Sequence, residues 1–332
     1  MFSIAMSKKN NTFYTTGNDG RIIQGDIERS TASNIIGANP YPNRVLALSG
    51  DEQYLVNGSD SSFMQIFNLA NNNRATIVRG HKGFVNDIDF LPDDSGFISA
   101  SVDKTLRLTN QKTGESEVLV TLPFDLKAID ISADSKWLVG ASSQGHVIRL
   151  DIASRKYEVI SDEAPNRILS IALNPANTLI AYGVEVLNEN KQTLRGTVKI
   201  YDIPSQKVTK QLSGHKSGIS DLEFSPDGLL LASAGLDKKL QMWVVEHPED
   251  LPIEMTNNSG NIWDIAFTKD NHYLIASCNN GEIRLWPTDP RALAELVCPK
   301  LTRNMTREEW SLYVEKDKDP EITCKSLVIE KF

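Results

Sequence analysis

Hydrophobic residues in this chain recur in a short phrase of alternating apolar and polar positions, which ends in an aromatic residue or a substitute for one. Two clear copies lie at residues 196–202 (GTVKIYD) and 281–286 (GEIRLW). The last position of the phrase falls at Gly25, Phe67, Thr109, Leu150, Tyr201, Trp243 and Trp286. Successive copies are 42, 42, 41, 51, 42 and 43 residues apart, and the long interval contains a polar insertion of about nine residues near 187–195. This near-constant spacing indicates seven repeated units.

Each unit has the same internal order. It begins with apolar residues at offsets 0, 3 and 5, as at Val85, Ile88 and Phe90. Strict alternation would give offsets 0, 2 and 4, so the slip predicts a β-bulge near the start of a first strand. A turn follows, such as residues 225–228 (SPDG), where Pro presets φ and Gly accepts a positive φ. A short apolar strand, a tight turn, the alternating phrase and a more polar stretch complete the unit. Four short strands in about 42 residues predict one blade of a β-propeller.

The repeat resembles the WD-repeat β-propeller family over about residues 1–289. In that family a His, a Ser, an Asp and a Trp of one blade form a hydrogen-bonded chain that ties its strands together. The matching positions are His215, Ser233, Asp237 and Trp243 in the sixth unit, and His81, Ser99 and Asp103 in the third, where Thr109 replaces the Trp. The first and fourth units depart further, with Gly25 and Leu150 at the Trp position. The resemblance implies an all-β, seven-bladed WD-repeat propeller and a structural role for both histidines, since buried polar groups in folded proteins are hydrogen-bonded.

The period stops after Trp286, and residues 290–332 are predicted to form a short C-terminal helical tail, with a possible closing strand, that packs on the propeller. Pro290 is typical of the first helical position, and Leu293, Leu296 and Val297 then follow at helical spacing. A second helix is expected further on, because Thr306 with Glu309 makes a capping box and Trp310 begins an apolar face.

Near the end of the chain, residues 326–329 (SLVI) are apolar and β-branched enough to form a strand. No residues before the first strand of unit one could supply an outer strand for unit seven. We therefore expect residues 325–332, or failing that the tail helices, to cover the outer edge of unit seven. The alternative is that the chain is a fragment whose natural upstream segment supplied that strand.

The tail adds a narrower resemblance, carried by residues 298–310 together with Tyr313 and Cys324. It is similar to the tail that closes many bacterial WD-repeat proteins whose front half is a caspase-like peptidase, a NACHT or similar STAND ATPase, a TIR domain or a kinase. In such proteins the propeller is the C-terminal sensor. The resemblance implies that this chain is the recognition part of a larger bacterial signalling or defence protein.

Composition narrows the class of partner. The 332 residues carry 35 Lys and Arg against 43 Asp and Glu, a net charge of −8, so electrostatics disfavour nucleic acid as the main partner. No apolar run is long enough for a membrane helix, and the first residues do not look like a signal peptide. The three cysteines are too few for a disulfide framework, and their spacings match no zinc site. We expect a cytoplasmic protein that does not associate with membranes.

Catalytic motifs are absent from the sequence. It contains no GxSxG, HExxH, GxGxxG or EF-hand pattern. Residues 140–145 have the glycine spacing of a P-loop, but His146 stands where the phosphate-binding Lys is required. We therefore expect no catalytic residues, no metal site and no cofactor, and a non-catalytic interaction or sensor module. The alternatives are a stand-alone scaffold protein and a hydrolase that uses acidic or polar residues in the central channel.

Carried over from the family, the loops that enter the first strands and the turns between the second and third strands lie on one face, around the channel mouth. We expect this face, and the insertion near 187–195 that projects from it, to bind a protein or peptide partner. Trp263, Phe84 and the arginines stand out there, since Trp and Arg dominate interface hot spots. The candidate binding residues are Arg44, Phe84, Asn86, Asp125, Lys127, Arg167, Asn261 and Trp263, within a wider ring that adds Phe2, Leu46, Asp60, Val102, Ser143, Leu169 and Asn279.

Overall fold

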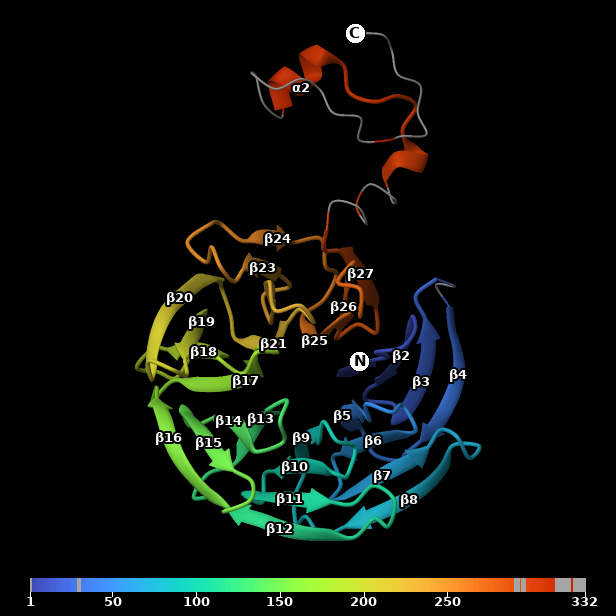
Figure 1. The fold of residues 1–332 in the computed structure, drawn as a ribbon, viewed down its shortest axis with the longest axis vertical. Coiled ribbons are helices and arrows are strands. Elements are labelled where there is room, and N and C mark those ends of the chain that lie inside the picture. Colours follow the sequence, from blue (N-terminus) through green and yellow to red (C-terminus); the bar gives the residue numbers. More distant parts are fainter. Residues whose placement is uncertain (1, 29–30, 290–292, 294–296, 314–323, 325–332) are drawn as a thin grey trace.

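Seven antiparallel sheets stand in a ring, as blades of a β-propeller (Figure 1). The structure is a computed structural model that describes every residue except 1, 29–30, 290–292, 294–296, 314–323 and 325–332. Within each sheet, strands that follow one another in sequence are neighbours, and the first strand lies nearest the centre of the ring. The seven-bladed fold predicted from the repeat is confirmed.

The blades follow the chain in order. Blade one contains β1 (Ser3–Met6), β2 (Thr12–Thr16), β3 (Arg21–Asp26) and β4 (Thr31–Ala38), and blade two contains β5 (Asn43–Leu48), β6 (Tyr54–Ser59), β7 (Phe63–Asn68) and β8 (Arg74–Arg79). Blade three contains β9 (Val85–Phe90), β10 (Phe97–Ser101), β11 (Thr105–Thr109) and β12 (Ser116–Thr121), and blade four contains β13 (Leu126–Ile131), β14 (Trp137–Ser142), β15 (His146–Asp151) and β16 (Lys156–Asp162). Blade five contains β17 (Arg167–Leu173), β18 (Leu179–Leu187), β19 (Thr193–Asp202) and β20 (Lys207–His215), and blade six contains β21 (Ile219–Phe224), β22 (Leu230–Gly235), β23 (Leu240–Val244) and β24 (Ile253–Met255). Blade seven contains β25 (Ile262–Phe267), β26 (Tyr273–Cys278) and β27 (Ile283–Pro287).

The predicted bulge is present in the first strand of blades two to seven. In blade three, for example, Val85 pairs with Ser101 while Asp87 pairs with Ala100, so Asn86 is the extra residue. The same shift occurs in the pairing of β5, β13, β17, β21 and β25 with their second strands. Because a bulge bends its strand and turns the extra residue out of register, it re-aims one side chain per blade.

Each apolar phrase from the sequence forms a third strand, and its last residue packs between neighbouring sheets. Trp243 is 4% exposed and packs in an apolar cluster with Leu222 and Leu231. In blade one Gly25 stands at this position because the ring of Phe13 fills the space, so that a Cβ on Gly25 would lie 2.3 Å from it. The aromatic filler is thus supplied by the second strand instead of the third.

The insertion near 187–195 lengthens the hairpin between β18 and β19, which pair from Leu179–Asp202 out to Leu187–Thr193. Near its turn the hairpin is held by the backbone N–H of Leu187, which donates to Oδ1 of Asn166 over 3.0 Å. The long interval in the repeat is therefore an extension of regular strand structure.

The predicted His–Ser–Asp networks are formed in blades three and six, and each His comes from the end of the preceding blade, at or just after its outer strand. His215 contacts Asp237 through Nδ1 at 3.0 Å and Ser233 through Nε2 at 2.6 Å, and His81 makes the matching contacts to Asp103 and Ser99 at 3.1 and 2.9 Å. Both histidines are buried, whereas Trp243 contributes to blade six through the apolar packing described above.

Blade five replaces this network with another. Tyr182 pairs with Ile171 as Ser99 pairs with Ile88, so Tyr182 occupies the Ser position. Its hydroxyl contacts Ser161 Oγ at 3.0 Å and donates to Glu163 over 3.1 Å, and Glu163 forms an ion pair with Lys199 at 2.7 Å. A buried polar network at this place is therefore retained although its residue types have changed.

Neighbouring blades are joined at the inner strands by hydrogen bonds from a backbone N–H to a carboxyl group of the preceding blade. Asp87 accepts from Ile129 and Asp89 from Ile131 between blades three and four, over 2.7 and 2.9 Å. The other bonds of this kind join Asp130 to Leu173, Asp221 to Ile265, Glu223 to Phe267 and Asp264 to Ile4, over 2.7 to 2.9 Å. The Asp264–Ile4 bond joins blade seven to blade one and so closes the ring.

Beyond β27 the tail contains helical residues at Leu293 and Val297, a 3₁₀ turn η1 (Cys298–Lys300) and a helix α2 (Arg307–Tyr313). The predicted capping box is confirmed, because Thr306 N–H donates to Glu309 over 2.9 Å and Glu309 N–H donates to Thr306 Oγ1 over 3.2 Å. The strand predicted for residues 325–332 lies outside the described residues. Among the described residues, no helix has the length and apolar character that a membrane crossing requires.

One disulfide, between Cys298 and Cys324, joins two parts of the tail with a Cα–Cα distance of 5.4 Å. The number of cysteines argued against a disulfide framework and did not predict this single bond. Spacing in sequence could not reveal this bond, since the tail brings together two residues 26 positions apart.

The network of blade six generates a stability prediction. Asp237→Ala leaves the buried His215 without its carboxyl partner, so the free energy of unfolding is expected to fall by about 1–3 kcal/mol. Denaturant unfolding monitored by circular dichroism measures this change. The control is Lys216→Ala, since Lys216 is exposed and contributes only its backbone N–H to Asp237. Equal midpoints for Asp237→Ala and Lys216→Ala would show that the network adds no stability.

Candidate functional site

A cavity of about 240 Å³ opens at the centre of the ring, and every blade contributes to its lining. Six of the lining residues are the extra residues of the first-strand bulges, and the seventh, Phe2, stands directly before β1. This ring of mouth residues consists of Phe2, Arg44, Asn86, Lys127, Leu169, Ser220 and Trp263. The bulges therefore build the channel mouth, because each one directs a side chain into it.

Sequence reasoning located most of this ring. Of the eight candidate residues, Arg44, Asn86, Lys127 and Trp263 line the cavity. The other four, Phe84, Asp125, Arg167 and Asn261, stand at or directly before the start of the same first strands. Whether any of them contacts a partner stays a prediction. Ser220 was missed, although its place directly after Ile219 matches that of Asn86 after Val85.

Aromatic side chains are accessible on the mouth. Trp263 is 37% exposed and meets Phe2 edge to face, with ring centroids 5.6 Å apart. Phe84 is 43% exposed, and the guanidinium of Arg44 lies 5.1 Å from the centroid of its ring. These contacts hold large, partly exposed rings in place, which lowers the entropy cost of using them in an interface.

Each cation at the mouth is paired with an acid of its own blade. Arg44 forms an ion pair with Asp60, Lys127 with Asp125 at 2.7 Å, and Arg167 with Glu185 at 3.1 Å. The mouth therefore offers no unpaired row of positive charge to a phosphate backbone.

The cavity floor is acidic. Asp87, Asp221 and Asp264 line it, and both carboxylate oxygens of Asp87 accept backbone N–H groups, from Ile88 and Ile129. Burial raises the pKa of Asp87 to about 8 and raises the pKa of Asp264. Burial and the neighbouring Asp264 charge raise the pKa of Asp221 well above its usual range.

These carboxyl groups act on the backbone, and in the described part of the chain no group of three His, Cys, Asp or Glu residues is arranged to hold a metal ion. Elsewhere along the inner strands, burial raises the pKa of Glu223 to about 8 and of Asp89 to about 6. Several of these groups therefore keep their protons near neutral pH, which reduces repulsion among them.

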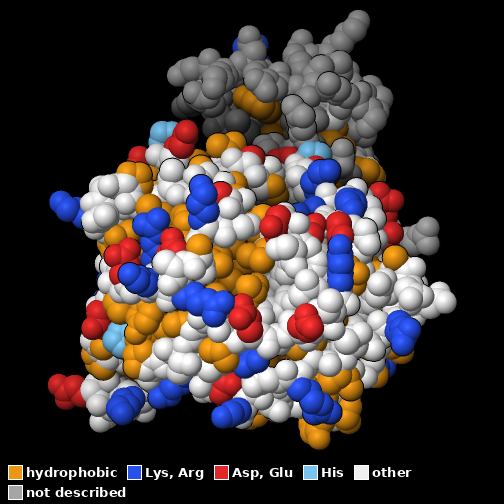
Figure 2. All heavy atoms as spheres, turned by 60° about the horizontal axis from the view of Figure 1, so that its bottom comes forward, with side chains coloured by type: hydrophobic (Ala, Val, Ile, Leu, Met, Phe, Trp, Pro, Cys, Tyr) orange, Lys and Arg blue, Asp and Glu red, His pale blue; other side chains and the backbone are white. Residues whose placement is uncertain are grey.

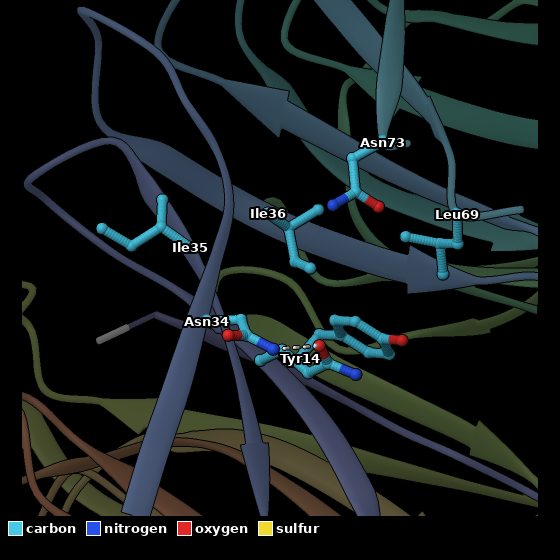
Figure 3. Close-up of a pocket in the computed structure, with 7 residues that line it drawn as sticks. Tyr14, Asn34, Ile35, Ile36, Leu69 and Asn73 are labelled. Carbon is cyan, nitrogen blue, oxygen red and sulfur yellow. Dashed lines mark hydrogen bonds between the residues drawn. The ribbon is translucent and has the colours of Figure 1, made fainter. Parts of the chain in front are cut away.

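A second cavity, of about 550 Å³, lies at the outside of the ring between β4 and the turn that follows β7 (Figure 3). Tyr14 and Asn34 lie on one side of it, and Leu69 and Asn73 on the other. The described residues of its lining include no Asp, Glu, His, Lys or Cys, so they offer no pair of groups for acid–base chemistry.

The outer rim offers no charged patch of one sign on the face drawn in Figure 2, where Lys and Arg side chains alternate with Asp and Glu. Exposed apolar residues such as Ile77 of β8 and Val118 of β12 stand on the outer strands among them. The channel mouth is therefore the better candidate site.

Comparison with known proteins agrees with the fold. Residues 72–110, 206–244 and 252–287 match the family model "WD domain, G-beta repeat". These segments include parts of blades two, three, five, six and seven, because the family's repeat begins with an outer strand.

The chain is also similar, at low sequence identity, to parts of several curated proteins. Apoptotic protease-activating factor 1 of Danio rerio is 22% identical over 276 residues, which cover 82% of this chain and 20% of that protein. Transcription initiation factor TFIID subunit 5 of Caenorhabditis elegans is 24% identical over 70% of this chain and 34% of its own length. Serine-threonine kinase receptor-associated protein of Gallus gallus is 26% identical over 58% of this chain and 52% of its own length. The chain thus spans about a fifth of the length of the first of these relatives.

The acidic channel generates a pH prediction. The folded state keeps protons on Asp87 and Glu223 up to a pH of about 8, whereas unfolded carboxyl groups lose them near a pH of about 4. Between these values the folded state binds more protons, so the free energy of unfolding falls as pH rises. Asp87→Asn and Glu223→Gln remove this dependence and are expected to lose less stability than the parent between pH 5 and pH 8.

Chemical denaturation at both pH values measures the difference between parent and variants. The parent and the variants are compared with each other because His81 adds a pH dependence of opposite sign to all of them. Burial lowers the pKa of His81, so its contribution to the free energy of unfolding rises with pH up to the usual histidine pKa. The prediction fails if the variants lose as much stability as the parent over this range.

Proposed function

We propose that this chain, a seven-bladed WD-repeat β-propeller, serves as a non-catalytic protein-interaction module that binds a protein or peptide at its channel mouth. The observation that carries the proposal is the ring of mouth residues, in which all seven blades converge on one cavity. Such a ring gives a single partner segment contacts with every blade.

The chemistry of the mouth supports a protein partner. Partly exposed Trp263 and Phe84 supply the large apolar contacts typical of interface hot spots, and Arg44 stacks on Phe84 beside them. The paired charges around them favour a polar rim over a phosphate-binding surface.

The floor carboxyl groups support a structural role instead of hydrolysis. Asp87, Asp221 and Asp264 each accept a backbone N–H of the next blade, so their oxygens are already engaged in joining blades. A carboxylate that acts as the general base of a hydrolase needs an oxygen that is free to take a proton from water or from the substrate.

We further propose that the propeller is the recognition part of a larger signalling protein. The apoptotic protease-activating factor is named for activating a protease, and this chain matches about a fifth of it. The likeness of residues 298–310 to the tails of bacterial sensor propellers supports the same assignment. The relatives named above are eukaryotic, so the bacterial setting rests on the tail alone, and the cytoplasmic location stays a prediction. Immunoblotting of the natural source tests the assignment: a band much larger than 36.9 kDa is expected, and a band at that mass supports a stand-alone scaffold.

Substitution at the mouth tests the interaction. A partner is captured with the parent chain, identified and purified, and its affinity is then measured by calorimetry. Trp263→Ala and Phe84→Ala are each expected to raise Kd at least tenfold, because each removes a large exposed contact, which corresponds to about 1.4 kcal/mol or more.

The matched control is Leu251→Ala, since Leu251 is 94% exposed and stands in the loop before β24, outside the mouth lining. It is expected to bind like the parent. Unchanged affinity in both mouth variants, with folding intact, would place the interaction elsewhere.

A further inference from the structure

The outer edge of blade seven differs from that of every other blade. Blades one to six each have four strands, whereas the described residues of blade seven form three, with β27 at the outer edge. An uncovered edge presents unpaired backbone groups that can accept another strand.

The exposed fractions of third-strand residues show that the outer edge of blade seven is less covered than that of the other blades. The first apolar residue of the third strand pairs with a residue of the outer strand in the other blades and is at most 2% exposed: Ile22, Met64, Leu106, Val147, Val198 and Leu240. Ile283 occupies the same register in β27, opposite Ser277, yet it is only half-buried. Two positions on, Leu285 is 37% exposed, whereas its counterpart Met242 in blade six is 3% exposed.

Backbone N–H groups of β27 also indicate that the outer edge of blade seven is open. Cys278 N–H donates to Glu282 O and Thr288 N–H to His272 O, which fixes the alternation of the ladder between β26 and β27. Since antiparallel pairs alternate, the N–H groups of Ile283 and Leu285 point away from β26, toward the open edge. In blade six the matching residues, Leu240 and Met242, pair with Met255 and Ile253 of β24.

The chain itself contains a segment with the composition of an outer strand. Residues 325–330 (KSLVIE) follow the same pattern as β8 (RATIVR): a basic residue, a small residue, a variable position, two β-branched residues and a charged residue. In β8, Val78 is 1% exposed and pairs with Met64, while Ile77 before it is 52% exposed. By this alignment Ile329 matches the buried Val78, and Val328 matches the exposed Ile77.

The start of this segment is tethered to the part of the tail that follows blade seven. Cys324 is bound to Cys298 by the disulfide, and its backbone N–H and C=O are both held by the side chain of Asn304, over 2.9 and 3.2 Å. Cys298 follows Pro287, the last residue of β27, by eleven positions, and eleven extended residues span at most about 36 Å. Within this reach the segment can return to the end of β27, where an antiparallel partner would begin.

We propose that residues 325–330 form the outer strand of blade seven, antiparallel to β27, with Ile329 covering Ile283 and Leu327 covering Leu285. The C-terminal tail then completes the ring from within the same chain.

Amide hydrogen exchange on the full chain tests this pairing with an internal control. In the parent, the amides of Ile283 and Leu285 are expected to be protected, along with those of Arg284 and Trp286, which face β26. Deletion of residues 325–332 is expected to speed exchange at Ile283 and Leu285 at least tenfold and to leave Arg284 and Trp286 unchanged.

Two matched substitutions separate this pairing from other effects of the tail. Ile329→Asp places a charge on the covering face and is expected to behave like the deletion, whereas Val328→Asp faces solvent and is expected to behave like the parent. Rapid exchange at Ile283 and Leu285 in the parent would overturn the proposal. So would protection that appears only as the concentration rises, since it would assign the edge to a second copy, or an equal effect of the two substitutions.

Discussion

The hydrogen bond between an inner-strand carboxyl group and a backbone N–H of the next blade is the interaction on which this structure depends. It joins blades three to four, four to five, six to seven and seven to one. Serine hydroxyls take its place at two of the other three junctions, where Ser3 accepts from Leu46 N–H and Ser170 donates to the carbonyl of Ile219. These short polar side chains fix the spacing of the inner strands and therefore the width of the channel.

The same geometry places the candidate site. Asp87 follows directly after the bulge residue Asn86. The hydrogen bond through which Asp87 joins two blades therefore also holds the backbone beside a mouth residue in place. Apolar packing beside these bonds, as in the cluster of Ile4, Phe13, Ala266 and Ile275 between blades one and seven, excludes water from them. Burial of the carboxyl groups then raises their pKa, so the acids that join the blades carry less charge than their number suggests.

The sequence was sufficient to predict those features that depend on local spacing. Seven units, the bulge, the His215–Asp237 contact and the Thr306–Glu309 capping box all follow from residues at fixed offsets, and the structure contains them. Most mouth residues could be located by the same rule, since a bulge residue stands at a fixed place in each unit.

Features that depend on partners far apart in sequence were missed. Asp87 and Asp89 look like the polar face of an ordinary strand, and only the ring brings each to an amide 42 residues away. The disulfide, the substitution of Tyr182 for a Ser and the filling of the space at Gly25 by Phe13 likewise depend on contacts made in three dimensions.

The exchange rate of the Ile4 amide in Asp264→Ala tests the central claim most directly, since this amide is bonded to an inner-strand carboxyl of the last blade and belongs to the first. If carboxyl–amide bonds hold the ring at the channel, exchange at Ile4 should rise at least tenfold relative to the parent while that of Ile129, bonded to the unchanged Asp87, stays the same. Equal rates at Ile4 in the variant and the parent would contradict the account and assign ring closure to apolar packing alone.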